Sequence, residues 1–141
     1  MCSGRNESSG RDPRYGGLLG LAEGAAVVVR RRIIPLDGKT TELTDAYFPP
    51  AIARGTRLAE TTKIPGGAVT LLAELGHVGD LVREEVSARM PDPAEQEALA
   101  LAPNEPVLTR TRVTLDASGE PFQVDVSVFA AMAEFIQTIE G

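Results

Sequence analysis

The chain has little cysteine, little histidine and no long apolar run, and each shortage excludes a class of site. Its one cysteine, Cys2, cannot form an internal disulfide, which favours a reducing compartment such as the cytoplasm. Its one histidine, His77, excludes a metal site built from several histidines, and we predict no metal or other cofactor. No apolar run reaches the length of about 18 residues that a membrane span needs. Residues 1–17 also lack the apolar core of a secretion signal.

Enzyme signatures and clustered positive charge are also missing. The sequence contains no nucleophile elbow, P-loop, zinc-protease helix, Cys-x-x-Cys pair or dinucleotide fingerprint, so we predict no catalytic residues. A net charge of -6 and a pI of about 4.8 weigh against direct binding to nucleic acid. The one basic run, Arg30-Arg31-Arg32, would alternate between the two faces of a strand. It therefore cannot form a continuous phosphate-binding stripe.

What the sequence does contain is an internal repeat, with its two copies about eighty residues apart. Each copy has a Leu-x-Leu segment, a five-residue gap, a valine-led strand with Arg-x-Arg, and a turn signal. Two copies are too few for a solenoid, so the repeat predicts one pseudo-symmetric domain. The matching residues are Leu19, Leu21, Ala22, Val27, Arg30 and Arg32 in the first copy, and Leu99, Leu101, Ala102, Val107, Arg110 and Arg112 in the second.

Hydrophobic patterning predicts an α+β domain, an antiparallel sheet with helices packed on one face. A polar, glycine-rich start at residues 1–17 is expected to be a disordered arm or linker remnant, with the folded domain over 18–141. A helix is expected after Asp92, with Pro93 at its first position and Glu95 at its third. Further helices are expected at 51–54 and 68–75, and strands at 27–34, 40–48, 81–90, 107–115, 121–129 and, as a short last strand, 135–139.

The order of several loose motifs resembles a known family. These motifs are the run 18–32 with the Asp37-Gly38 turn, and the segments 45–49, 84–97, 99–101, 104–108 and 119–125. They are similar to the UTRA (UbiC transcription regulator-associated) domain, the effector-binding half of GntR-type, HutC-like bacterial transcription regulators. The resemblance implies a chorismate-lyase-like fold, a small-molecule effector and a homodimer. It also implies that DNA is bound only through a winged helix-turn-helix, for which residues 1–17 leave no room.

The resemblance further implies where the effector binds. The family's ligand-contacting arginine falls on Arg32, whereas its second arginine falls on Ile34 and a strand carboxylate falls on Thr44, so the pair for a phosphate or carboxylate is incomplete. A small residue of the family falls on Gly67, at the start of a predicted helix whose N–H groups can face an anion. The candidate ligand-binding residues are Arg32, Thr44, Gly66, Gly67, Glu85, Arg112, Gln123 and Asp125.

Other interpretations of these residues stay open. Strand arginines can instead pair with carboxylates on neighbouring strands and have no ligand. A small chorismate-lyase-like enzyme could use Arg32, Arg112 and Glu85 to hold a dicarboxylate. A ligand-free dimerisation scaffold is favoured by the departures at Ile34 and Thr44. A pocket lined by polar side chains would distinguish a sensor from a scaffold, and turnover assays would distinguish a sensor from an enzyme.

Overall fold

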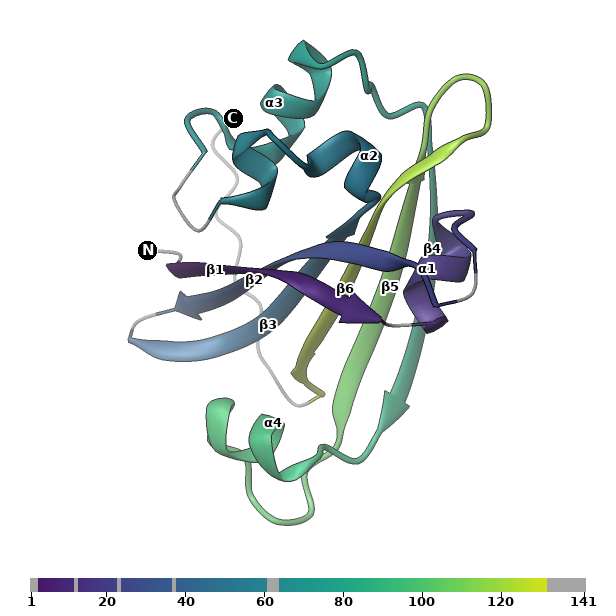
Figure 1. Ribbon diagram of the computed structural model, residues 1–141. Coiled ribbons are helices and arrows are strands. Elements are labelled where there is room, and N and C mark those ends of the chain that lie inside the picture. The colour runs from purple at the N-terminus through teal and green to yellow at the C-terminus, as the bar shows by residue number, and fades with distance from the viewer. Residues whose placement is uncertain (1–2, 12, 23, 37, 61–63, 132–141) are drawn as a thin grey trace, which may run out of the picture.

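The structure is a computed structural model and describes residues 3–11, 13–22, 24–36, 38–60 and 64–131. Six antiparallel strands form one sheet in the order β1-β2-β3-β6-β5-β4 (Figure 1). The strands are β1 (Ser3–Arg11), β2 (Ala26–Leu36), β3 (Lys39–Phe48), β4 (Leu81–Arg89), β5 (Val107–Leu115) and β6 (Pro121–Ala130). The helices are α1 (Pro13–Leu18), α2 (Pro50–Ala53), the 3-10 turn η1 (Arg57–Ala59), α3 (Gly67–Glu74) and α4 (Pro93–Ala98). The predicted antiparallel α+β fold is confirmed, and the strand expected at 135–139 lies outside the described residues.

The repeat is a β-α-β-β unit used twice. Its first copy is β1-α1-β2-β3 and its second is β4-α4-β5-β6, with α2, η1 and α3 inserted between the copies. Equivalent positions have equivalent partners: Arg32 lies opposite Thr44, and Arg112 lies opposite Asp125. The copies meet where β3 pairs with β6, with Thr44 opposite Ser127. The register therefore relates the two halves of the sheet by an internal pseudo-twofold axis.

The expectation of a disordered arm at 1–17 was wrong. Residues Ser3–Arg11 form β1, which pairs with β2, and Pro13–Leu18 form α1. A polar segment can form a strand at a sheet edge, because backbone hydrogen bonds to the neighbouring strand hold it without a buried apolar face. The first β-α-β-β copy therefore starts inside the expected arm.

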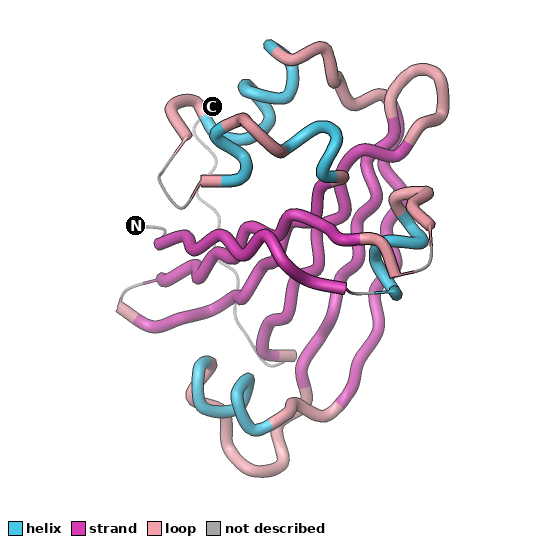
Figure 2. The backbone as a smooth tube through the Cα atoms, in the orientation of Figure 1, coloured by secondary structure: helices cyan, strands magenta, loops and turns pink. Residues whose placement is uncertain are grey.

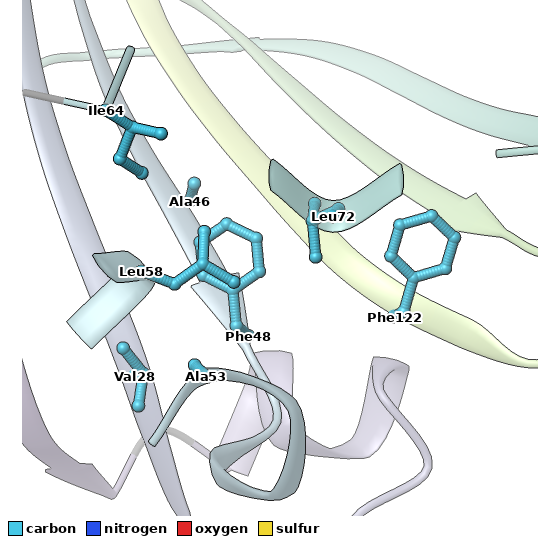
Figure 3. Packing of buried hydrophobic residues seen from close by; sticks show 8 residues of the cluster. All are labelled: Val28, Ala46, Phe48, Ala53, Leu58, Ile64, Leu72 and Phe122. Atoms are coloured by element: carbon cyan, nitrogen blue, oxygen red, sulfur yellow. The ribbon is translucent and has the colours of Figure 1, made fainter. Parts of the chain in front are cut away.

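Helices cover both faces of the sheet, a difference from the predicted single covered face (Figure 2). On one face, Val28 and Phe48 pack under residues of α2, η1 and α3 such as Leu58 and Leu72 (Figure 3). On the opposite face, the segment after each short helix supplies one buried leucine. Leu19 packs on β2, β3 and β6, in a cluster with Val27, Val29, Tyr47 and Val124. Leu99 packs on β5 and β6, in a cluster with Val107 and Val128. The two short helices α1 and α4, one in each repeat copy, lie on the face opposite α2, η1 and α3. Hydrophobic periodicity along single strands does not reveal which face of the sheet a helix covers.

Local signals at the helix ends match the prediction. Asp92 caps α4: its carboxylate accepts from the Glu95 N–H at 2.8 Å, and the Glu95 side chain accepts from the Asp92 N–H at 2.9 Å. Glu95 also receives two bonds from Arg89 at 2.7 Å, which tie α4 to the end of β4. The inserted helix α3 begins after Gly66, whose φ of 79° suits glycine.

The repeat predicts that Leu19 and Leu99 contribute to stability in the same way. They are 5% and 1% exposed, so Leu19→Ala and Leu99→Ala should each lower the free energy of unfolding by about 2–5 kcal/mol. Leu18→Ala, at a side chain that is 43% exposed, is the control and should cost no more than about 0.5 kcal/mol. Urea unfolding measures all three. A Leu19→Ala cost no larger than that of the control would contradict the packing of this segment on the sheet.

Candidate functional site

Four arginines lie on one face of the sheet, which we call the arginine face. Side chains alternate along a strand, so Arg30 and Arg32 of β2 share a face, as do Arg110 and Arg112 of β5. The cross-strand pairs running from β2 through β3 and β6 to β5 put both pairs on the same face. Arg31 points to the opposite face, where its Nε donates to Asp45 Oδ1 at 2.9 Å. The predicted division of the basic run between two faces is thus confirmed.

The equivalent arginines Arg32 and Arg112 differ in their partners. Arg112 donates from Nε to Glu84 Oε1 at 2.6 Å, and its Nη2 lies 2.5 Å from the same oxygen. Glu84 lies directly opposite Arg112 on β4, whereas the residue opposite Arg32 on β1 is Gly4, which has no side chain. Within the described part of the chain, Arg32 makes no hydrogen bond or ion pair. It is therefore a cation without a bound counter-charge.

Asp125 is the carboxylate at the centre of the arginine face. Gln123 Nε2 donates to both of its oxygens at 2.9 Å. Burial raises the pKa of Asp125 above its ordinary value, while the bond from Gln123 and the positive charges of Arg32, Arg112 and Arg110 act in the opposite direction. A partly buried carboxylate among cations is a strong hydrogen-bond acceptor for a hydroxyl or amino group.

Beside Asp125, a chain of hydrogen bonds crosses the junction between the two repeats. Thr44 Oγ1 donates to Glu42 Oε2 at 2.5 Å and lies 3.0 Å from Ser127 Oγ. Because the single hydroxyl hydrogen of Thr44 is used on Glu42, Ser127 must donate to Thr44. Arg110 Nη2 in turn donates to Ser127 Oγ at 3.5 Å. Thr44 is only 2% exposed, so its hydroxyl is buried beneath the surface of the arginine face and holds its neighbours Glu42 and Ser127 in place.

The structure brings some of the predicted site residues together and separates others. Arg32, Arg112, Gln123 and Asp125 share the arginine face. Glu85 does not: it lies opposite Thr111, on the other face, and the carboxylate beside Arg112 is Glu84. Glu84 and Glu85 are neighbours on β4 and point to opposite faces of the sheet. Only the register of β4 with β5 determines which of the two lies beside Arg112.

Gly66 and Gly67 lie in the inserted segment that covers part of the arginine face. Ile64 and Leu72, before and within α3, pack against Val28 and Phe48 of that face. Both glycines are exposed and have positive φ, so the backbone turns sharply into α3.

Guanidinium groups gathered on one sheet face are groups that can hold a small anion. The four arginines share this face with the carboxylates of Glu42, Glu84 and Asp125, and the charge of Glu60 also acts on Arg30. The described residues contain no group of histidine, cysteine or carboxylate side chains suited to a metal, and none of their helices has the length and hydrophobicity of a membrane span.

Comparison with protein families identifies the domain. The model of the UTRA domain matches residues 12–133. The chain belongs to the UTRA domain family. An uncharacterized HTH-type transcriptional regulator of Streptomyces coelicolor is 34% identical to this UTRA domain over 115 residues, which are 79% of the chain and 43% of that regulator. The chain thus spans less than half the length of this curated relative.

Solved structures share the fold of this UTRA domain. One assigned to the GntR family of transcriptional regulators has a TM-score of 0.84 at 20% identity, covering 99% of this chain and 59% of that one. The effector domain of PhnF from Mycobacterium smegmatis has a TM-score of 0.76 at 18% identity, covering 100% of this chain and 88% of that domain. The resemblance to the UTRA domain is confirmed, and with it the chorismate-lyase-like architecture.

Asp125→Asn tests the electrostatics of the arginine face. A carboxyl group whose pKa is raised on folding stabilises the protein below its unfolded pKa, about 3.9, and this contribution is lost as the pH rises through the folded pKa. At pH 7 the buried charge therefore opposes folding, and Asp125→Asn should be more stable than the wild type. The gain should disappear near pH 3. Urea unfolding at both pH values checks this, and Asp45→Asn on the opposite face is the control. Destabilisation by Asp125→Asn at pH 7 would mean that the arginines outweigh burial.

Proposed function

We propose that this UTRA domain senses a small anionic effector on its arginine face, with Arg32 as the main anion-binding group. One observation carries the proposal: Arg32 has no partner among the described residues, while its repeat equivalent Arg112 is neutralised by Glu84. An arginine that faces a glycine has all its N–H donors available for a carboxylate or phosphate. Of the two equivalent arginines, Arg112 is therefore paired with a carboxylate of the domain, and Arg32 is available for a ligand.

The neighbouring polar groups would supply the remaining contacts. Asp125 and Gln123 can accept from and donate to hydroxyl or amino groups of the effector, and Arg112 can strengthen the positive field. We retain Gly66 and Gly67 as candidates for backbone contacts with the anion, because the N-terminus of α3 carries partial positive charge. Thr44 is proposed as a supporting residue, since its hydroxyl is already bonded on both sides.

The family points to the setting in which such a sensor acts. We propose that the domain belongs to a HutC-like regulator of the GntR family, works by binding and not by catalysis, and acts in the cytoplasm, where a separate winged helix-turn-helix would contact DNA. The curated relative and the structural neighbours are named as transcription regulators or their effector domains, which supports this proposal.

We further propose that the domain forms a homodimer through β4. This strand ends the sheet, and all nine of its residues are exposed, including Val82 and Val86 at 47% and 57%. An exposed edge strand pairs readily with another copy of itself. Antiparallel pairing that sets Arg83 opposite Glu85 of the second copy also sets Val82 opposite Val86, which gives two charge pairs and two apolar pairs. The same register sets Glu84 opposite its own copy, and the ion pair of each Glu84 with Arg112 offsets that repulsion.

Substitution of Arg32 tests the effector site. A thermal-stability screen of phosphosugars, amino acids, dicarboxylates and nucleosides identifies a ligand, because a ligand at 100 times its Kd should stabilise the fold by about 2.7 kcal/mol. Calorimetry should then show that Arg32→Ala weakens binding by about 1.5–3 kcal/mol, the usual contribution of a hydrogen bond to a charged group. Arg31→Ala, on the opposite face, should bind normally. Equal affinities of the two variants would place the effector elsewhere.

A charge reversal tests the β4 interface. Sedimentation at micromolar concentration should show a dimer for the wild type. Arg83→Glu places two like charges opposite each other and should weaken the dimer, by up to about 1 kcal/mol for each of the two pairs. The double variant Arg83→Glu/Glu85→Arg restores opposite charges and should dimerise like the wild type. A monomeric wild type, or a double variant as weak as the single one, would exclude this pairing.

A further inference from the structure

Three alternate residues of β2, Val28, Arg30 and Arg32, lie on the arginine face, and each has a different environment. Val28 is 1% exposed and packs beneath Leu58 of η1 (Figure 3). Arg30 follows, half-buried beside the same segment. Arg32 comes last, exposed and without a partner among the described residues. The strand therefore leads from hydrophobic core, through Arg30, to the proposed anion site.

Arg30 binds the backbone of the inserted segment. Its Nη1 donates to the carbonyl oxygens of Arg57, Leu58 and Glu60 at 3.0, 3.4 and 2.8 Å. These carbonyls belong to η1 and the residue that ends it, where a short helix has its partial negative charge. A single guanidinium thus fastens the C-terminal end of η1 to the sheet.

The second repeat lacks this contact. Arg110, the equivalent of Arg30, donates to Ser127 and lies 6.0 Å from the centre of the Phe129 ring. The segment that Arg30 holds follows β3, and among the described residues no equivalent segment follows β6. The role of Arg30 therefore comes from the insertion and not from the repeat.

We propose that Arg30 is a positioning residue that holds residues 56–60 against the arginine face and couples their position to an anion on Arg32. The coupling part rests on the effector site proposed above. The part of the proposal in which Arg30 holds residues 56–60 in place, called the hold below, rests on the three carbonyl contacts and not on the effector site.

Electrostatics gives the coupling its sign. Arg30 and Arg32 are like charges on one strand face, and burial together with the charge of Arg32 lowers the pKa of Arg30. An anion on Arg32 offsets that repulsion and should tighten the contacts of Arg30 with the carbonyls. Coupling between two equilibria is reciprocal, so the contacts of Arg30 should raise the affinity for the anion by the same factor.

Hydrogen exchange without any ligand tests the hold. The N–H groups of Ala59 and Glu60 donate to the carbonyls of Thr56 and Arg57 and should exchange slowly in the wild type. Arg30→Gln should speed their exchange at least tenfold, and Arg30→Lys, which keeps a charged donor, should restore much of the protection. Arg31→Gln, next along the strand and facing the other way, is the matched control. Equal exchange in Arg30→Gln and Arg31→Gln would overturn the proposal.

Titration with inorganic phosphate tests the coupling. In the wild type, phosphate should slow exchange at Ala59 and Glu60 further, and Arg30→Gln should weaken phosphate binding severalfold although Arg30 itself bonds to the backbone. In an Arg32→Ala background, Arg30→Gln should change phosphate affinity no further. Additive effects of the two substitutions would overturn the coupling. A wild type that binds no phosphate would contradict the effector site and the coupling together, while the ligand-free exchange still decides the hold.

Discussion

The pairing of β3 with β6 is the constraint on which the rest of the molecule depends. It joins the two β-α-β-β units and sets Thr44 opposite Ser127 and Ala46 opposite Asp125. A slip of one residue would move every side chain of one unit to the other face of the sheet. The arginines of the two units would then face opposite sides, and Leu19 and Leu99 would no longer pack on a common face. One register thus fixes both the core and the arginine face.

On this symmetric framework the two halves have diverged in charge. Asp125 in the second unit corresponds to Thr44 in the first, and Glu84 corresponds to Gly4. Arg32 therefore has no carboxylate directly opposite it on either neighbouring strand, whereas Arg112 has one on each side. An asymmetric charge on a symmetric sheet can give a ligand one orientation, because its anionic end and its hydroxyl or amino end meet different partners.

The sequence alone allowed most strands and helices to be predicted, since apolar periodicity and cap residues are local signals. The strand β1 was missed because its polar residues carry no such period, and its pairing with β2 is not visible in the local sequence. A signal did exist: Asp12-Pro13 precedes Leu19 as Asp92-Pro93 precedes Leu99, so the repeat extends further back than its apolar residues suggest. Arg32 and Asp125 are candidates from the sequence that lie on one sheet face in the structure. The carboxylate beside Arg112 could not be predicted, because the choice of Glu84 over Glu85 depends on pairing between distant strands.

The distribution of charge also accounts for what such a face can select. The chain as a whole carries a net charge of -6, so its average field repels long polyanions such as nucleic acids. The arginine face is a local exception, and the carboxylates of Asp125, Glu42 and Glu84 lie within or beside it. If Arg32 holds the effector as proposed, a compact anion would reach it without approaching the rest of the acidic surface, whereas an extended one would not. The contrast between the face and its surroundings would then favour small anions, in addition to any single contact.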